Sequence, residues 1–104
     1  MEEWTEQQLS RWMNEEEGLK FVYLYTPLCG TCKVTERMLQ VVIAMQPELP
    51  IVKCNVNFCP TLARSWQVES VPCIVRAENR QLIEKKYRMQ GVDELLRWFQ
   101  RAIS

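Results

Sequence analysis

Histidine is absent from this chain of 104 residues. Without an imidazole, the chain cannot form a Ser-His-Asp triad, a Cys-His pair, a histidine proton shuttle or a histidine-ligated metal site. The side chains that remain for chemistry are carboxylates, lysines, tyrosines and thiols.

The sequence also lacks an excess of charge and a long apolar run. Its 13 Lys and Arg residues balance 13 Asp and Glu residues, whereas phosphate contacts need a surplus of cations. The longest near-apolar stretch, 41–45, is far too short to span a bilayer, and the acidic N-terminus shows no signal peptide. We therefore expect a soluble, cytoplasmic protein with no nucleic-acid or membrane partner.

The composition that is present is that of an ordinary globular domain, with 47% hydrophobic and 25% charged residues. No repeat, low-complexity tract or linker divides the sequence, so we expect a single domain over residues 1–104. Five cysteines are too few for a disulfide-stapled secreted scaffold, and their odd number leaves one thiol unpaired in a monomer.

Hydrophobic periodicity predicts helices that alternate with strands. Helices are expected at 5–17, 30–46 and 60–66 and from residue 92 to the end, and strands at 19–25, 51–56, 71–77 and 82–87. The apolar stripes expected on the two longest helices are Val34, Met38, Val41, Val42 and Met45, then Val92, Leu95, Leu96, Phe99 and Ile103. This order predicts an α/β fold, with a mixed central sheet between helices on both faces.

A Cys-x-x-Cys motif, Cys29 to Cys32, falls between the first predicted strand and the long helix that follows. Two intervening residues on a helical turn bring both sulfurs close enough to form a disulfide. Unpaired N–H groups at a helix N-terminus favour a thiolate, and the thiolate is the form that attacks disulfides. The motif therefore indicates thiol-disulfide exchange.

With its surroundings, this motif resembles the thioredoxin family. The resemblance rests on residues 25–33, on the strand at 51–56 and on residues 66–72, which end in Val71 and Pro72. It covers nearly the whole chain, and it implies a thioredoxin-like three-layer sandwich.

The resemblance also implies roles. Cys29 and Cys32 would be the catalytic pair of a thiol-disulfide oxidoreductase, a protein-disulfide reductase that needs no cofactor or metal. Pro72 would be a cis-proline beside them, and the backbone of Val71 would pair with an extended substrate segment. The residues implied in substrate binding are Gly30, Thr31, Val71 and Pro72. The implied partners are disulfide-containing proteins and a reductase, such as thioredoxin reductase or a small dithiol.

The sequence departs from the family pattern at several positions. Leu28 and Thr31 replace a tryptophan and a proline of the active-site motif, and the Thr31 hydroxyl is placed to hydrogen-bond a sulfur. Tyr23 stands where the family has a buried acid, and a phenol is a poor base near neutral pH. Arg88 replaces a glycine near the substrate groove, which predicts a different or more restricted partner surface.

Three cysteines lie outside the motif. Cys54 falls in an apolar strand and is expected to pack in the core. Cys59 precedes Pro60 at a helix start, where its pKa could be lowered, or it is an ordinary surface or half-buried thiol. Cys73 follows Pro72 and is open to three roles, as a packing residue, an auxiliary redox thiol or a metal ligand, of which we favour packing.

Two alternative functions remain open from the sequence. Cys29, Cys32, Cys59 and Cys73 supply enough thiolates for zinc or an iron–sulfur cluster, although a second Cys-x-x-Cys is missing. A noncatalytic binding module on the same scaffold is the other alternative, because a fold does not dictate a function.

Overall fold

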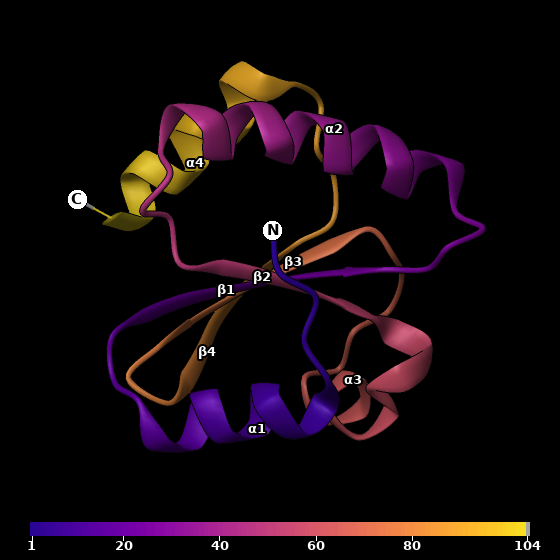
Figure 1. Cartoon of the computed structure of the whole chain (residues 1–104), viewed down its shortest axis with the longest axis vertical. Coiled ribbons are helices and arrows are strands. Elements are labelled where there is room, and N and C mark those ends of the chain that lie inside the picture. The colour runs from indigo at the N-terminus through magenta and orange to yellow at the C-terminus, as the bar shows by residue number, and fades with distance from the viewer. Residues whose placement is uncertain (104) are drawn as a thin grey trace.

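The computed structural model describes residues 1–103 and is built around a mixed four-stranded sheet (Figure 1). Its strands are β1 (Leu19–Tyr25), β2 (Ile51–Asn55), β3 (Cys73–Glu78) and β4 (Gln81–Lys86). The spatial order is β2-β1-β3-β4, with β1 parallel to β2 and the other two pairs antiparallel. The first strand is thus an inner strand of the sheet, and residues 20–24 on it are all buried.

Helices cover both faces of this sheet, so the molecule has three layers. Helices α2 (Gly30–Met45) and α4 (Val92–Ile103) lie on one face, and α1 (Glu6–Glu15) and α3 (Pro60–Ser65) lie on the other (Figure 1). Each interface between the layers has its own hydrophobic cluster, one around Phe21 and Phe99 and one around Leu9 and Val22. The expected α/β sandwich with a mixed sheet is confirmed.

The first helix begins where its sequence predicts a cap. The Thr5 side chain accepts a hydrogen bond from the Gln8 backbone, and the Gln8 side chain accepts one from the Thr5 backbone, which together form a capping box. Leu9 is fully buried, and Trp12 and Met13 pack against the same cluster. Thr5 is therefore the N-cap rather than the first helical residue, and the helix ends two residues earlier than predicted.

Three predicted strands have different bounds in the structure. The strand predicted at 51–56 ends at Asn55, whose side chain accepts a hydrogen bond from Asn57 N and caps a short 3-10 helix, η1 (Val56–Phe58). The strand predicted from residue 71 begins at Cys73, since the proline at 72 has no N–H to donate to a strand ladder. The last strand spans 81–86 rather than 82–87.

The apolar stripe predicted for α2 is mostly wrong. Val34, Val41 and Met45 are about half exposed or more. The residues that α2 buries are Cys32, Thr35, Leu39 and Val42. These positions also recur at three- and four-residue steps, so periodicity alone did not distinguish the two faces; packing against the sheet and α4 did.

The stripe of α4 is partly right. Leu95 and Phe99 are buried as predicted, but Ile103 is exposed, and the buried Trp98 was missed. The Trp98 indole packs at 5.5 Å from the Phe21 ring and donates a hydrogen bond to Glu84. An indole can be buried this way because its polar N–H finds an acceptor.

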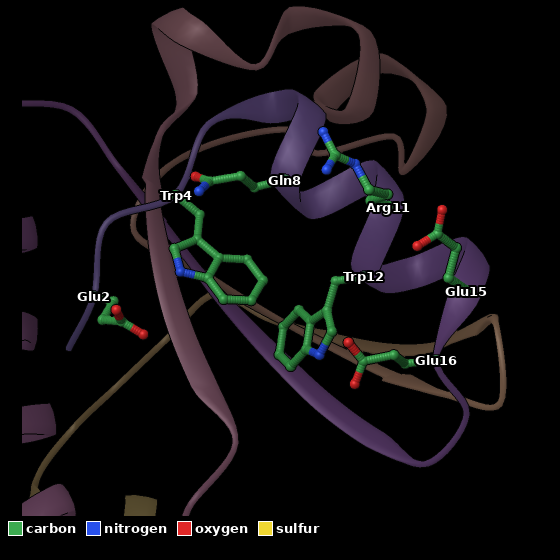
Figure 2. A pocket seen from close by; sticks show the side chains of 7 residues that line it. All are labelled: Glu2, Trp4, Gln8, Arg11, Trp12, Glu15 and Glu16. Carbon is green, nitrogen blue, oxygen red and sulfur yellow. The ribbon is translucent and has the colours of Figure 1, made fainter.

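The N-terminal segment covers the outer edge of β2. Lys53 N donates to Glu2 O at 2.9 Å, and Trp4 N donates to Lys53 O at 2.9 Å. Trp4 and Trp12 line a cavity of about 360 Å³ between this segment and α1, and their rings meet edge to face at 5.0 Å (Figure 2). This cavity lies on the face of the sheet opposite α2, and no cysteine lines it.

No helix within residues 1–103 has the length and apolar character needed to cross a membrane.

Candidate redox site

Cys29 and Cys32 are joined by a disulfide at the start of α2. Their Cα atoms lie 5.1 Å apart, inside the usual range for disulfide-bonded residues. Cys29 is the N-cap of the helix, in extended conformation, and Cys32 is in its first turn. The predicted placement of the motif at the helix N-terminus is confirmed.

Two donors surround the Cys29 sulfur. The backbone N–H of Cys32 donates to it across 3.1 Å, and the Thr31 hydroxyl lies 3.3 Å away. Both contacts, together with the helix dipole, stabilise negative charge on this sulfur when the disulfide is reduced. The predicted contact between Thr31 and a sulfur is therefore present.

The two cysteines differ in exposure. Cys29 is half-buried, whereas Cys32 is only 2% exposed. Gly30 and Thr31, between them, are exposed, and Leu28 before them is 97% exposed. A partner approaching this end of the sheet therefore meets the Cys29 sulfur before the Cys32 sulfur.

The peptide bond between Val71 and Pro72 is cis, the isomer that the resemblance implied. In the antiparallel register of β1 and β3, Cys73 lies opposite Leu24, near the end of β1. Residues just before Cys73 therefore extend past the end of β1, toward the loop that carries Cys29. The sheet thus brings Val71 and Pro72, both half-buried, to the same end of the strands as the disulfide.

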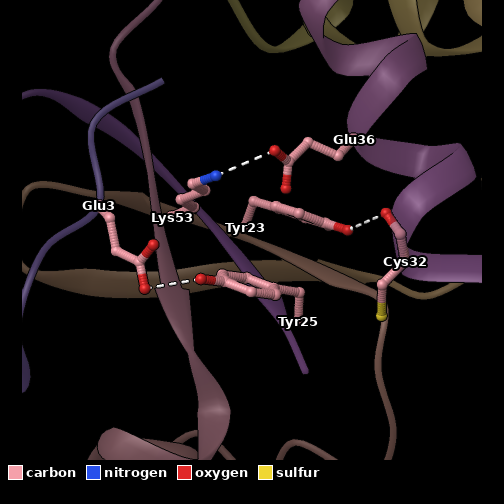
Figure 3. A network of polar contacts seen from close by, with 6 residues as sticks. All are labelled: Glu3, Tyr23, Tyr25, Cys32, Glu36 and Lys53. Atoms are coloured by element: carbon pink, nitrogen blue, oxygen red, sulfur yellow. Dashed lines mark hydrogen bonds and ion pairs between the residues drawn. The ribbon is translucent and has the colours of Figure 1, made fainter. Parts of the chain in front are cut away.

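Tyr23 is fully buried beneath the disulfide turn. Its hydroxyl donates a hydrogen bond of 2.6 Å to the backbone carbonyl of Cys32 (Figure 3). Burial, and next to it the charge of Glu36, raises the pKa of Tyr23 above its ordinary value of 10.0. Tyr23 therefore remains protonated and anchors the first turn of α2; it does not replace the family's buried acid as a base.

An ion pair lies beside this tyrosine. Lys53 Nζ is 2.9 Å from a carboxylate oxygen of Glu36, and both side chains are mostly covered. Tyr25 stacks on Tyr23 at 5.8 Å, lies under the Lys53 ammonium and donates a hydrogen bond to Glu3 (Figure 3). The network links the N-terminal segment, β1, β2 and α2.

Sequence reasoning missed this network, although two signals for it exist. Tyr23 and Tyr25 are two residues apart on one strand, so they share a face, and Glu36 lies one helical turn after Cys32. No sequence signal pointed to Lys53 as a member of the network, because only the parallel pairing of β1 with β2 places Lys53 opposite Tyr23.

The three cysteines outside the motif are all buried free thiols. Cys54 lies in the core as expected. Cys59 lies at the start of α3 as expected, but it is fully buried rather than at the surface or half-buried. Its pKa is raised rather than lowered, by the neighbouring Cys54 thiol and by burial. Cys73 is fully buried too, and burial raises its pKa to about 11, which agrees with packing.

The structure does not bring together a thiolate ligand set. Within residues 1–103, no group of three or more Cys, Asp or Glu side chains is arranged to hold a metal ion. Cys29 and Cys32 bond to each other. Cys59 and Cys73 pack in the hydrophobic cluster around Leu9 and Val22, on the α1 face of the sheet.

A Cys-x-x-Cys pair at disulfide distance, on a three-layer α/β sandwich of this kind, defines a thiol-disulfide oxidoreductase. The chain belongs to the thioredoxin family, whose model, described as Thioredoxin, matches residues 1–101. It is 40% identical over 80 residues to the thioredoxin-like protein YusE of Bacillus subtilis, a match that covers 77% of this chain and 76% of that protein. It is 34% identical over 61 residues to the mitochondrial thioredoxin-3 of Saccharomyces cerevisiae, with 59% and 48% covered.

Solved structures show the same fold. A mutant thioredoxin from Halobacterium salinarum superposes with a TM-score of 0.80 at 20% identity, over 96% of this chain and 88% of that one. The oxidised mitochondrial thioredoxin 3 of Saccharomyces cerevisiae superposes with a TM-score of 0.77 at 24% identity, over 97% and 94%.

Proposed function

We propose that this protein reduces disulfide bonds in other proteins, with Cys29 as the attacking thiol and Cys32 as the resolving thiol. The observation that carries the assignment is the difference between the two sulfurs. Cys29 is half-buried at the helix N-terminus, with two donors on its sulfur, whereas Cys32 is buried behind it. An accessible, stabilised thiolate suits attack, and a buried partner suits resolution.

The reaction takes two exchange steps. The Cys29 thiolate attacks one sulfur of the substrate disulfide; a mixed disulfide forms, the substrate S–S bond breaks, and the other substrate sulfur leaves as a thiolate. Cys32 then loses its proton and attacks Cys29; the Cys29–Cys32 bond forms and the mixed disulfide breaks. The substrate gains two electrons from the Cys29–Cys32 pair. Of its two protons, one comes from Cys32 and one from water, which had taken up the proton of Cys29 when the thiolate formed.

The proton on Cys32 needs an acceptor other than Tyr23. The Tyr23 hydroxyl already donates to the Cys32 carbonyl, and its raised pKa keeps it protonated. We infer that the departing substrate thiolate, directly or through water, receives this proton. Resolution would then depend on the leaving thiol more than on a buried carboxylate.

Substrate binding is proposed for the residues that surround the disulfide. The turn at Gly30 and Thr31 is exposed, and the Val71 backbone precedes β3 at the same edge, where an extended segment could pair with it beside Pro72. The exposed Leu28 offers an apolar contact in place of the family's tryptophan. Arg88 is exposed as well and stands at the position that the resemblance places near the substrate groove.

Regeneration and location follow from the same chemistry. The oxidised pair needs two electrons from a reductase, such as thioredoxin reductase, or from a small dithiol, and we propose such a partner. Three free thiols alongside the disulfide fit a reducing compartment, so we propose a cytoplasmic location. We further propose that residues 1–104 form one domain, because the family model spans nearly all of them.

Turnover of insulin disulfides with dithiothreitol as reductant tests the assignment. We expect Cys29→Ser to abolish turnover, and Cys32→Ser to accumulate a mixed disulfide with a substrate held on Cys29. Cys73→Ala is the matched control, since this thiol is buried in the other cluster, and it should retain turnover. Full activity of Cys29→Ser would refute the proposal. A mixed disulfide between the substrate and Cys32, rather than Cys29, would refute it as well.

A further inference from the structure

Two buried thiols outside the redox site share one acceptor. Cys54, at the end of β2, and Cys59, the N-cap of α3, each place their sulfur 3.5 Å from the backbone oxygen of Asn55. Both thiols therefore point at the same oxygen, which brings the two sulfurs close to each other. The 3-10 turn η1 between them folds the chain back and creates this contact.

The third free thiol is not placed to pair with Cys54. Leu24 lies opposite Cys54 in β2 and opposite Cys73 in β3, so Cys54 and Cys73 are two strand spacings apart. That spacing is about 9–10 Å between Cα atoms, whereas a disulfide needs less than about 7 Å. Cys59 is therefore the thiol that Cys54 can reach.

Cys54 also lines a cavity at the surface. This cavity has a volume of about 260 Å³, and its other lining residues are Glu3, Trp4, Thr5, Asn55 and Phe58. Cys54 is only 1% exposed, so a small molecule reaches it more readily than a protein does. The neighbouring Cys59 thiol lowers the pKa of Cys54, which favours the reactive thiolate at this position.

We propose that Cys54 and Cys59 form a second oxidisable dithiol, which hydrogen peroxide reaches through this cavity and converts to a disulfide. The Cys54 thiolate attacks one peroxide oxygen; an S–O bond forms, the O–O bond breaks, and the leaving hydroxide takes up the thiol's proton as water. Cys59 then attacks the Cys54 sulfur; the S–S bond forms, the S–O bond breaks and a second water leaves. The two thiols lose two electrons, and the peroxide is reduced to two waters.

The sequence makes this disulfide simple to detect. Cleavage by trypsin after Lys53 and Arg64 releases both cysteines on one peptide, 54–64, while Cys73 falls on 65–76 and the Cys29–Cys32 pair on 21–33. Native protein would be treated with hydrogen peroxide, quenched in acid, unfolded, alkylated with iodoacetamide and digested. The expected product is a 54–64 peptide that is two hydrogen atoms lighter and carries no alkyl group.

The variants separate this dithiol from the proposed reductase. The light peptide is expected in the full chain and in the Cys29→Ser, Cys32→Ser double variant, which excludes transfer from the redox site. Cys59→Ser should lose the light peptide entirely, and Cys73→Ala, the matched control, should keep it. Because the full chain is measured too, a variant that fails to fold leaves the test intact.

Three outcomes in the full chain overturn the proposal. The first is a 54–64 peptide that remains doubly alkylated after peroxide treatment. The second is a bridge from this peptide to 65–76. The third is sulfinic or sulfonic acid on Cys54 without a disulfide.

Discussion

Replacing Tyr23 by phenylalanine removes a single hydroxyl from beneath the redox turn. This hydroxyl donates to the Cys32 carbonyl at 2.6 Å, and both residues are buried. The carbonyl belongs to the first turn of α2, so it keeps its helical hydrogen bond, and the ring keeps its packing. The loss is therefore that of one buried hydrogen bond, about 1 kcal/mol of unfolding free energy.

Urea unfolding of the oxidised protein measures this difference directly. In a thermal scan of a chain of this size, the same loss of about 1 kcal/mol lowers Tm by roughly 4–8 °C. Tyr25→Phe is the matched control, because it removes a tyrosine hydroxyl from the same strand whose partner, Glu3, is exposed. We expect Tyr25→Phe to lower the free energy of unfolding by less than about half as much as Tyr23→Phe does.

The same pair of variants reports on the proton acceptor. If Tyr23 only anchors the helix, Tyr23→Phe should leave the pH dependence of the Cys32 resolution step unchanged in single-turnover measurements. An unfolding free energy equal to that of the unsubstituted protein would refute the anchoring role. A changed pH profile would refute the inference that Tyr23 takes no part in proton transfer.

Two further predictions concern Cys73 and the ion pair between Lys53 and Glu36. Burial raises the pKa of Cys73 from an ordinary value of 9.0 to about 11. The neutral thiol therefore stabilises the folded protein fully below pH 9. This stabilisation, roughly 2–3 kcal/mol, is lost as the pH rises from 9 to 11. Urea unfolding across this range should show a flatter profile for Cys73→Ala, and parallel profiles would contradict the assignment. For the ion pair between Lys53 and Glu36, a double-mutant cycle with Lys53→Met and Glu36→Gln should give a coupling free energy of about 1 kcal/mol. This coupling should decrease in 1 M salt. A coupling near zero would show that the pair is only a surface contact.

Local rules explain why the redox motif was predictable. Cys29 and Cys32 are three residues apart in a helical first turn, so chain geometry alone brings their sulfurs together. The Thr5 and Gln8 capping box is equally local. In such cases the partners are neighbours in the sequence, and a short stretch determines the contact without help from the rest of the fold.

Long-range pairing explains what the sequence did not reveal. Cys59 follows an apolar strand by only a few residues, yet η1 turns it into the core and against Cys54. The buried face of α2 was misassigned by periodicity, since two stripes fit the same spacing and only the sheet distinguished them. Lys53 meets Glu36 beside Tyr23 through strand register, which is a property of two segments far apart in the sequence.

The sequence by itself therefore determined the order of helices and strands, the Cys-x-x-Cys pair and its place at a helix N-terminus, because each depends on side chains a few residues apart. Only the tertiary structure decided that Tyr23 donates to the Cys32 carbonyl, and that Cys54 and Cys59 share one acceptor. Those contacts depend on burial and register. Burial changes the chemistry of a phenol or a thiol, and register selects its partner; neither is encoded in a local run of residues.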